Sequence, residues 1–73
     1  MSKYHIPDPF LVEIGERVRK MRKVKGVTLR QLGEMCEMDF GHLSRLENGQ
    51  KDLHLLTLKK LADKLDVEVK DLL

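Results

Sequence analysis

With 73 residues, the chain has room for one domain around a small core, and too little for a substrate pocket with its supporting residues. Hydrophobic residues make up 41% and only three residues are aromatic, so we expect a globular chain with an aliphatic core. The net charge of +2 hides an asymmetry, because residues 1–30 carry eight Lys and Arg against three Asp and Glu, whereas residues 31–73 carry six against nine. The basic residues 1–30 either bind a polyanion or form an ordinary solvated helix face.

The sequence lacks the usual signs of a catalytic, metal-binding or membrane protein. It contains no glycine-rich phosphate loop and no nucleophile beside a base, so we expect no enzyme activity, no cofactor and no small-molecule ligand. Cys36 is the only cysteine and has no ligand-like spacing with the histidines, which argues against a disulfide and a metal site. No apolar run is long enough to span a membrane, and a cytoplasmic location is expected.

The first predicted helix follows a flexible N-terminal arm, residues 1–8. Asp8 and Pro9 are typical of a helix start, since aspartate caps free N–H groups and proline fits the first helical position. Apolar residues then recur at helical spacing, which predicts a helix from about Pro9 to Lys25, ended by Gly26.

Two short helices are predicted next. Thr28 and Gln31 form a capping box at the start of a helix from about Leu29 to Cys36. Asp39 is the cap of a third helix, which ends at Asn48-Gly49, where glycine is free to take the left-handed conformation.

An apolar stripe predicts a fourth helix from about Leu55 to Leu65, and residues 67–73 can form one or two closing turns. With short connections and no strand signal, residues 9–73 are expected to form one all-α domain of five helices.

The second helix, the turn and the third helix resemble a helix-turn-helix, in which the second of the two helices lies in the DNA major groove. The chain as a whole resembles the small DNA-binding domains of phage repressors, Cro proteins and xenobiotic-response-element-type bacterial regulators. The resemblance covers about residues 10–73 and depends on the order and spacing of four segments, 14–22, 26–28, 43–49 and 58–65. It implies a compact lambda-repressor-like domain and a transcriptional regulator that binds double-stranded DNA as a homodimer at a palindromic operator.

The resemblance also implies which residues contact DNA. Base contacts are expected on the third helix, from Phe40, Gly41, Ser44 and Arg45. Arg45 either spans two acceptors of guanine or contacts a phosphate or stays in solvent, and Phe40 either rests on a thymine methyl or packs against the second helix. The residues expected to contact the DNA backbone are Arg19, Lys23, Arg30, Gln31, His42, Asn48, Gln50 and Lys51.

Two further sets of residues are expected to form structural contacts, one within the domain and one at its C-terminal end. Arg22 and Glu47 each follow a buried position by four residues, and the family resemblance implies a partly buried salt bridge between them. Val67, Val69, Leu72 and Leu73 either form an apolar dimer interface or cap the core of their own domain.

A rival hypothesis is an antitoxin-type protein-interaction module in which DNA binding is secondary. It is supported by Phe40, by Gly41, and by Leu29, which replaces the glutamine usual in the family at the start of the second helix.

Overall fold

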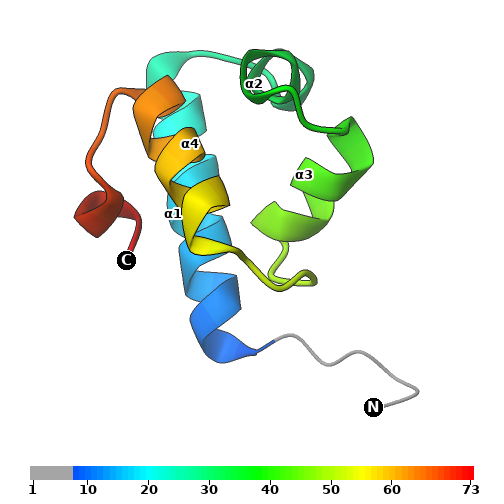
Figure 1. The fold of residues 1–73 in the computed structure, drawn as a ribbon, viewed down its shortest axis with the longest axis vertical. Helices are drawn as coiled ribbons and strands as arrows, with labels where there is room; N and C mark the ends of the chain where they lie inside the picture. Colours follow the sequence, from blue (N-terminus) through cyan, green and yellow to red (C-terminus); the bar gives the residue numbers. More distant parts are fainter. Residues whose placement is uncertain (1–7) are drawn as a thin grey trace.

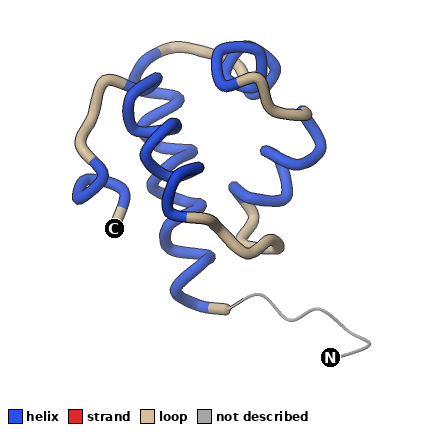
Figure 2. Tube along the Cα trace, in the orientation of Figure 1, coloured by secondary structure: helices blue, strands red, loops and turns tan. Residues whose placement is uncertain are grey.

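The computed structural model describes residues 8–73, which form four α-helices and a short 3-10 helix (Figures 1 and 2). The elements are α1 (Pro9–Lys25), α2 (Leu29–Cys36), α3 (Phe40–Glu47), α4 (Leu55–Leu65) and η1 (Val69–Leu72). This part of the chain contains no strand, which confirms the all-α class. The fifth element is one 3-10 turn instead of the fifth α-helix that was expected.

The bounds of α1 follow from its two ends. The Asp8 carboxylate accepts a hydrogen bond from the Phe10 N–H at 2.8 Å, and Pro9 occupies the first turn. Gly26 ends the helix in the left-handed conformation, with φ 80°, and its N–H donates to the Arg22 carbonyl at 3.0 Å. Asp8 therefore belongs to the folded domain, whereas the rest of the predicted arm lies outside the described residues.

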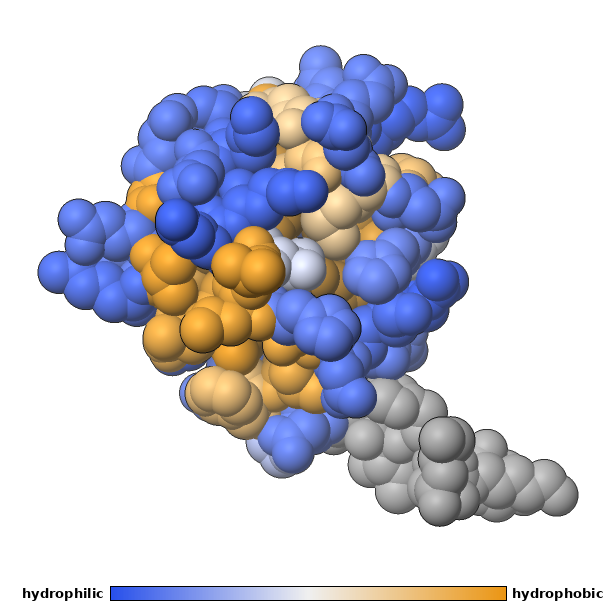
Figure 3. All heavy atoms as spheres, viewed as in Figure 1, coloured by the Kyte–Doolittle hydropathy of each residue, from blue (hydrophilic) through white to orange (hydrophobic). Residues whose placement is uncertain are grey.

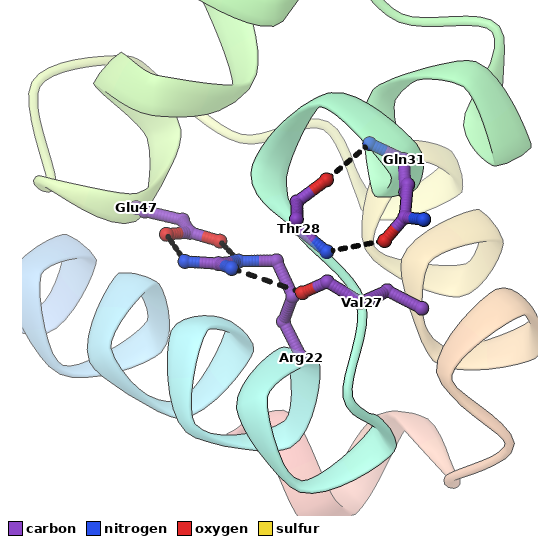
Figure 4. Close-up of polar contacts among 5 residues, drawn as sticks. All are labelled: Arg22, Val27, Thr28, Gln31 and Glu47. Carbon is purple, nitrogen blue, oxygen red and sulfur yellow. Dashed lines mark hydrogen bonds and ion pairs between the residues drawn. The ribbon is translucent and has the colours of Figure 1, made fainter.

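Reciprocal capping starts α2. The Gln31 N–H donates to the Thr28 hydroxyl at 3.0 Å, and the Thr28 N–H donates to the Gln31 side-chain oxygen at 2.8 Å (Figure 4). The predicted capping box is thereby confirmed. Its effect is to satisfy two backbone N–H groups that the helix itself leaves without an acceptor.

The turn between α2 and α3 is short and tightly bonded. Glu37 takes the left-handed conformation with φ 55°, and the Met38 N–H donates to the Gly33 carbonyl at 2.8 Å. The Asp39 carboxylate then accepts a hydrogen bond from the His42 N–H at 3.1 Å, so that α3 begins directly after the turn. These bonds hold α2 and α3 at a fixed angle.

The core is aliphatic, as expected, and all four α-helices contribute to it. Its buried members are Ile14, Val18, Leu32, Cys36, Leu43, Leu46, Leu58, Leu61, Ala62, Leu65 and Leu72. Figure 1 shows α4 lying across α1, with α2 and α3 on one side of the pair and η1 on the other. Both aromatic residues in the described part of the chain, Phe10 and Phe40, stay outside this core.

The end of the chain packs on the core, which was one of the two alternatives predicted for this segment. Leu72 is fully buried, and Val67 and Val69 are partly buried against the same core cluster. A side chain with no exposed surface cannot contact a second copy, so the core-capping alternative applies to Leu72. Of the four residues proposed, only Leu73 is well exposed, at 50%.

Cys36 is a core residue rather than a reactive thiol. It is buried, and this burial raises the pKa of the thiol, an effect that the nearby charges of Lys60 and Lys64 oppose. Residues 8–73 contain no cluster of His, Cys, Asp and Glu side chains that could hold a metal ion. Within the same residues, every helix is too short or too polar to cross a membrane.

Candidate nucleic-acid interface

The C-terminal end of α3 is anchored on α1 by close backbone contact. A Cβ atom added to Gly15 would lie 2.5 Å from the Glu47 carbonyl oxygen, and one added to Gly49 would lie 2.7 Å from Val12. No larger residue fits at Gly15 unless α1 and α3 move apart. Since Leu43 and Leu46 are also buried, one side and one end of α3 are held by the domain.

A buried ion pair fixes the same end of α3. Arg22 Nε lies 2.7 Å from Glu47 Oε2, and Arg22 Nη2 donates to Glu47 Oε1 at 3.2 Å, which makes the pair bidentate (Figure 4). Only 12% of the Arg22 side chain and 6% of the Glu47 side chain are exposed. Arg22 Nη1 also donates to the Val27 carbonyl at 3.1 Å. One guanidinium thus joins α1, the end of α3 and the segment that leads into α2, in the pairing that the family resemblance implies.

The opposite side of α3 faces solvent. Arg45 is exposed, Phe40 is 48% exposed, and Gly41 and Ser44 are half-buried. Arg45 Nη1 lies 3.6 Å from the position that a Cβ on Gly41 would take, because residues four apart are neighbours on a helix. The guanidinium therefore lies back along α3, beside the one residue that has no side chain to obstruct it.

Phe40 contacts α2 through a charged group. The guanidinium carbon of Arg30 lies 5.7 Å from the centre of the Phe40 ring, within the range of a cation–π contact. The ring thereby joins α2 to the start of α3, while about half of its surface remains accessible. Phe40 can therefore pack against α2 and still contact a thymine methyl, so the two alternatives predicted from the sequence are compatible.

The expected backbone-contacting residues lie on both flanks of α3, with two exceptions. Gln31 is on the first turn of α2, and its side-chain oxygen accepts the Thr28 N–H, so its NH₂ group is left to donate. His42 is half-buried on the first turn of α3. Asn48, Gln50 and Lys51 follow the last turn, where the Gln50 N–H donates to the Arg45 carbonyl at 2.9 Å and turns the loop back toward α3.

The exceptions are Arg19 and Lys23. They line a shallow groove on α1 together with Glu16, Lys20 and Val24, and no residue of α2 or α3 lines it. Lys23 lies roughly 140° around the helix from the buried Val18, which places it on the solvent side of α1. Their contact with the DNA backbone stays a prediction.

One residue at this site was missed in the sequence, and another was predicted only as a helix cap. The predicted cap is Asp39, whose carboxylate accepts the His42 N–H at the start of α3. Gly15 permits the close contact with α3, and its signal was a glycine on the apolar stripe of a helix, where it weakens the helix unless close packing requires it.

Together, these features define a helix-turn-helix domain: two short capped helices across a tight turn, the second held from behind by α1 and exposed on its other side. The helix-turn-helix family matches residues 18–72, and the chain belongs to this family. Its family and fold are those of DNA-binding transcriptional regulators.

Individual relatives agree with this assignment. The chain is 32% identical over 62 residues to the HTH-type transcriptional regulator DdrOP3 of Deinococcus deserti, a match that covers 85% of the chain and 48% of the relative. The chain thus spans about half the length of that curated relative.

Among solved structures, the restriction-modification controller protein C.AhdI of Aeromonas hydrophila is 33% identical with a TM-score of 0.83, over 86% of this chain and 96% of that one. The biofilm master regulator SinR, solved in complex with DNA, is 37% identical with a TM-score of 0.75, over 81% of this chain and 95% of that one.

Proposed function

We propose that residues 9–73, with Asp8 as a helix cap, regulate transcription by binding a specific duplex DNA sequence through α3 in the major groove. The observation that carries the proposal is the position of Arg45, exposed on a helix whose other side and C-terminal end are held rigidly. A side chain reads a base reliably only when the element that carries it is fixed. The proposed location is the cytoplasm.

Side-chain chemistry indicates which of these residues contact bases and which contact phosphates. The Arg45 guanidinium has the planar fork that matches the N7 and O6 acceptors of guanine. Gly41 lets the backbone of α3 approach the base edges, and Phe40 and Ser44 are further base contacts beside it. Sequence-independent contacts to phosphate come from Arg30, Gln31, His42, Asn48, Gln50 and Lys51.

We further propose that two copies bind together. A homodimer would set its two α3 helices about 34 Å apart, one turn of DNA, and would read a palindromic operator. SinR, which is 37% identical and was solved in complex with DNA, supports DNA binding by this chain.

Selection of duplexes from a random pool tests sequence-specific binding and would supply the operator. We expect a palindromic consensus, bound with an affinity that falls steeply with salt, by about 0.9 log units per log unit of salt for each phosphate contact. Lys51→Ala removes one such contact from each copy, so the slope should fall by about 1.8 for a dimer and about 0.9 for a monomer.

A pool from which no duplex is enriched would refute the proposal. It would favour the rival function, a protein-interaction module, for which the exposed ring of Phe40 is the supporting observation. In that case Phe40 would be the first residue to test against a protein partner.

A further inference from the structure

The ring of Phe40, at the start of α3, is apolar and exposed in polar surroundings. Figure 3 shows apolar surface gathered over the region that Figure 1 assigns to the start of α4 and the end of the chain, not over α3. The residues around Phe40 are charged or small, with Arg30 on α2 and Asp39 and Gly41 on either side of it in the chain. Phe40 is nevertheless 48% exposed. An apolar ring on the surface proposed to enter the major groove calls for an apolar group on the DNA.

The apolar group that the major groove offers to a side chain is the methyl group at C5 of a pyrimidine. Thymine carries this methyl group, and 5-methylcytosine carries it at the same position of the base. The methyl group neither donates nor accepts a hydrogen bond, so the donors of Arg45 do not detect it directly. An aromatic ring detects it by burying it.

Arg30 is placed to hold the ring in one position. Its guanidinium carbon lies 5.7 Å from the centre of the Phe40 ring, near the outer limit of a cation–π contact. A guanidinium stacks through its flat face, so the N–H groups at its edge remain able to donate to a phosphate. Among the described residues, no carboxylate forms an ion pair with Arg30. A phosphate bound by Arg30 would therefore fix the guanidinium and, with it, the ring.

Gly41 leaves space beside the ring. Apart from its chain neighbours and the backbone of α3, a Cβ atom built on Gly41 would have only Asp39 Oδ2, at 3.1 Å, and Arg45 Nη1, at 3.6 Å, within 4 Å. The space that a side chain would fill is thus open, with Phe40 as the preceding residue and the Arg45 guanidinium at its border. A pyrimidine whose methyl group enters this space would lie next to the base that Arg45 contacts.

We propose that Phe40, positioned by Arg30, recognises the C5 methyl group of one pyrimidine in each operator half-site. The inference rests on the proposed function and names the chemical group that Phe40 contacts. Arg30 is a positioning residue for this contact, because it acts on the methyl group through the ring. Where the pyrimidine is thymine, the methyl group is part of the operator sequence. Where it is cytosine, binding depends on DNA methylation, and a cytosine-C5 methyltransferase would regulate the protein.

Duplexes that differ only in methyl groups test the inference. In the selected operator, each thymine is replaced in turn by uracil and each cytosine by 5-methylcytosine, symmetrically in both half-sites. Neither change alters the hydrogen-bonding groups in the major groove. At one position the methylated form should bind about fourfold more tightly per half-site, which corresponds to about 0.8 kcal/mol for one buried methyl group. A response at a thymine identifies sequence recognition, and a response at a cytosine identifies sensing of DNA methylation.

Three variants assign the effect to the two residues. Phe40→Ser should abolish the methyl preference, and Arg30→Gln should reduce it to less than about twofold. Arg19→Gln is the matched control, because Arg19 is also an exposed arginine but lies on α1, and it should keep the full preference. The ratio of the two affinities is the measured quantity, since the loss of a phosphate contact or of stability lowers both affinities by the same factor. Thermal melting checks that each variant is folded.

An operator whose affinity changes by less than about twofold at every pyrimidine would overturn the inference and leave the proposed function intact. A methyl preference that survives in Phe40→Ser, or in full in Arg30→Gln, would also overturn it. A random pool that yields no operator would instead remove the proposed function and this inference together, so the two failures are distinguishable.

Discussion

Replacing Arg22 with methionine should destabilise the domain more than any change on the DNA-binding surface. The variant leaves the Glu47 carboxylate, with 6% of its side chain exposed, without the partner that holds it at 2.7 Å. It also removes the donor to the Val27 carbonyl. Breaking a buried pair in this way costs about 3–5 kcal/mol, a large share of the stability of a domain of this size. Since 1 kcal/mol shifts the melting temperature of such a domain by about 4–8 °C, we expect a decrease of at least about 12 °C in a thermal melt followed by circular dichroism.

A second variant separates the stranded charge from simple loss of packing. Arg22→Met combined with Glu47→Leu removes both charges and fills the same space with apolar groups, a replacement that is often neutral or stabilising. The double variant should therefore melt well above Arg22→Met alone. If Arg22→Met melted within about 2 °C of the parent, or if the two changes were additive, the ion pair could not be what holds α3 to α1.

Three more predictions concern the same framework, each measured by equilibrium unfolding. Gly15→Ala should cost about 1–3 kcal/mol, because its methyl group meets the Glu47 carbonyl oxygen at 2.5 Å. Gly41→Ala, whose methyl group meets only side-chain atoms of Asp39 and Arg45, should stay within about 1 kcal/mol of the parent. Thr28→Ala should cost about 1 kcal/mol through the lost cap at 3.0 Å, and Thr28→Ser should not. Burial raises the pKa of the Cys36 thiol, so the folded state favours the protonated form and its advantage is lost as pH rises through the folded pKa. The stability difference between the parent and Cys36→Ala should accordingly shrink as the pH rises above the ordinary pKa of a thiol, about 8.5, and a constant difference would contradict the assignment.

The helices could be predicted from the sequence because their ends are specified locally. Asp8, Thr28 and Gly26 each act on backbone groups within a few residues, and the predicted limits of α1, α2 and α4 agree with the structure. The prediction was poorer at the end of the chain, where a fifth helix was expected and η1 is a single 3-10 turn. The limit of α4 was predicted, but the left-handed conformation of Asp66 that ends it, with φ 59°, was not.

Long-range contacts between polar side chains could not be predicted from spacing alone. Lys25 pairs with Asp66, forty-one positions away, and Arg17 donates to the Leu73 carbonyl, fifty-six positions away. Arg22 and Glu47 were expected to pair only because the chain resembles a family in which that pair occurs. The burial of Leu72 was equally undetermined, because an apolar tail can cover its own core or a second copy, and only the packing of η1 on α1 and α4 decides between them.

The most direct test of the central claim compares Arg45→Ala and Lys51→Ala on two duplexes, the selected operator and a scrambled sequence of the same length. If α3 reads bases, Arg45→Ala should lose about 1–3 kcal/mol per operator half-site and much less on the scrambled duplex. Lys51→Ala should weaken both complexes by the same factor, since a phosphate contact carries no sequence information. Equal losses on the two duplexes for Arg45→Ala, or no loss on either, would contradict the account.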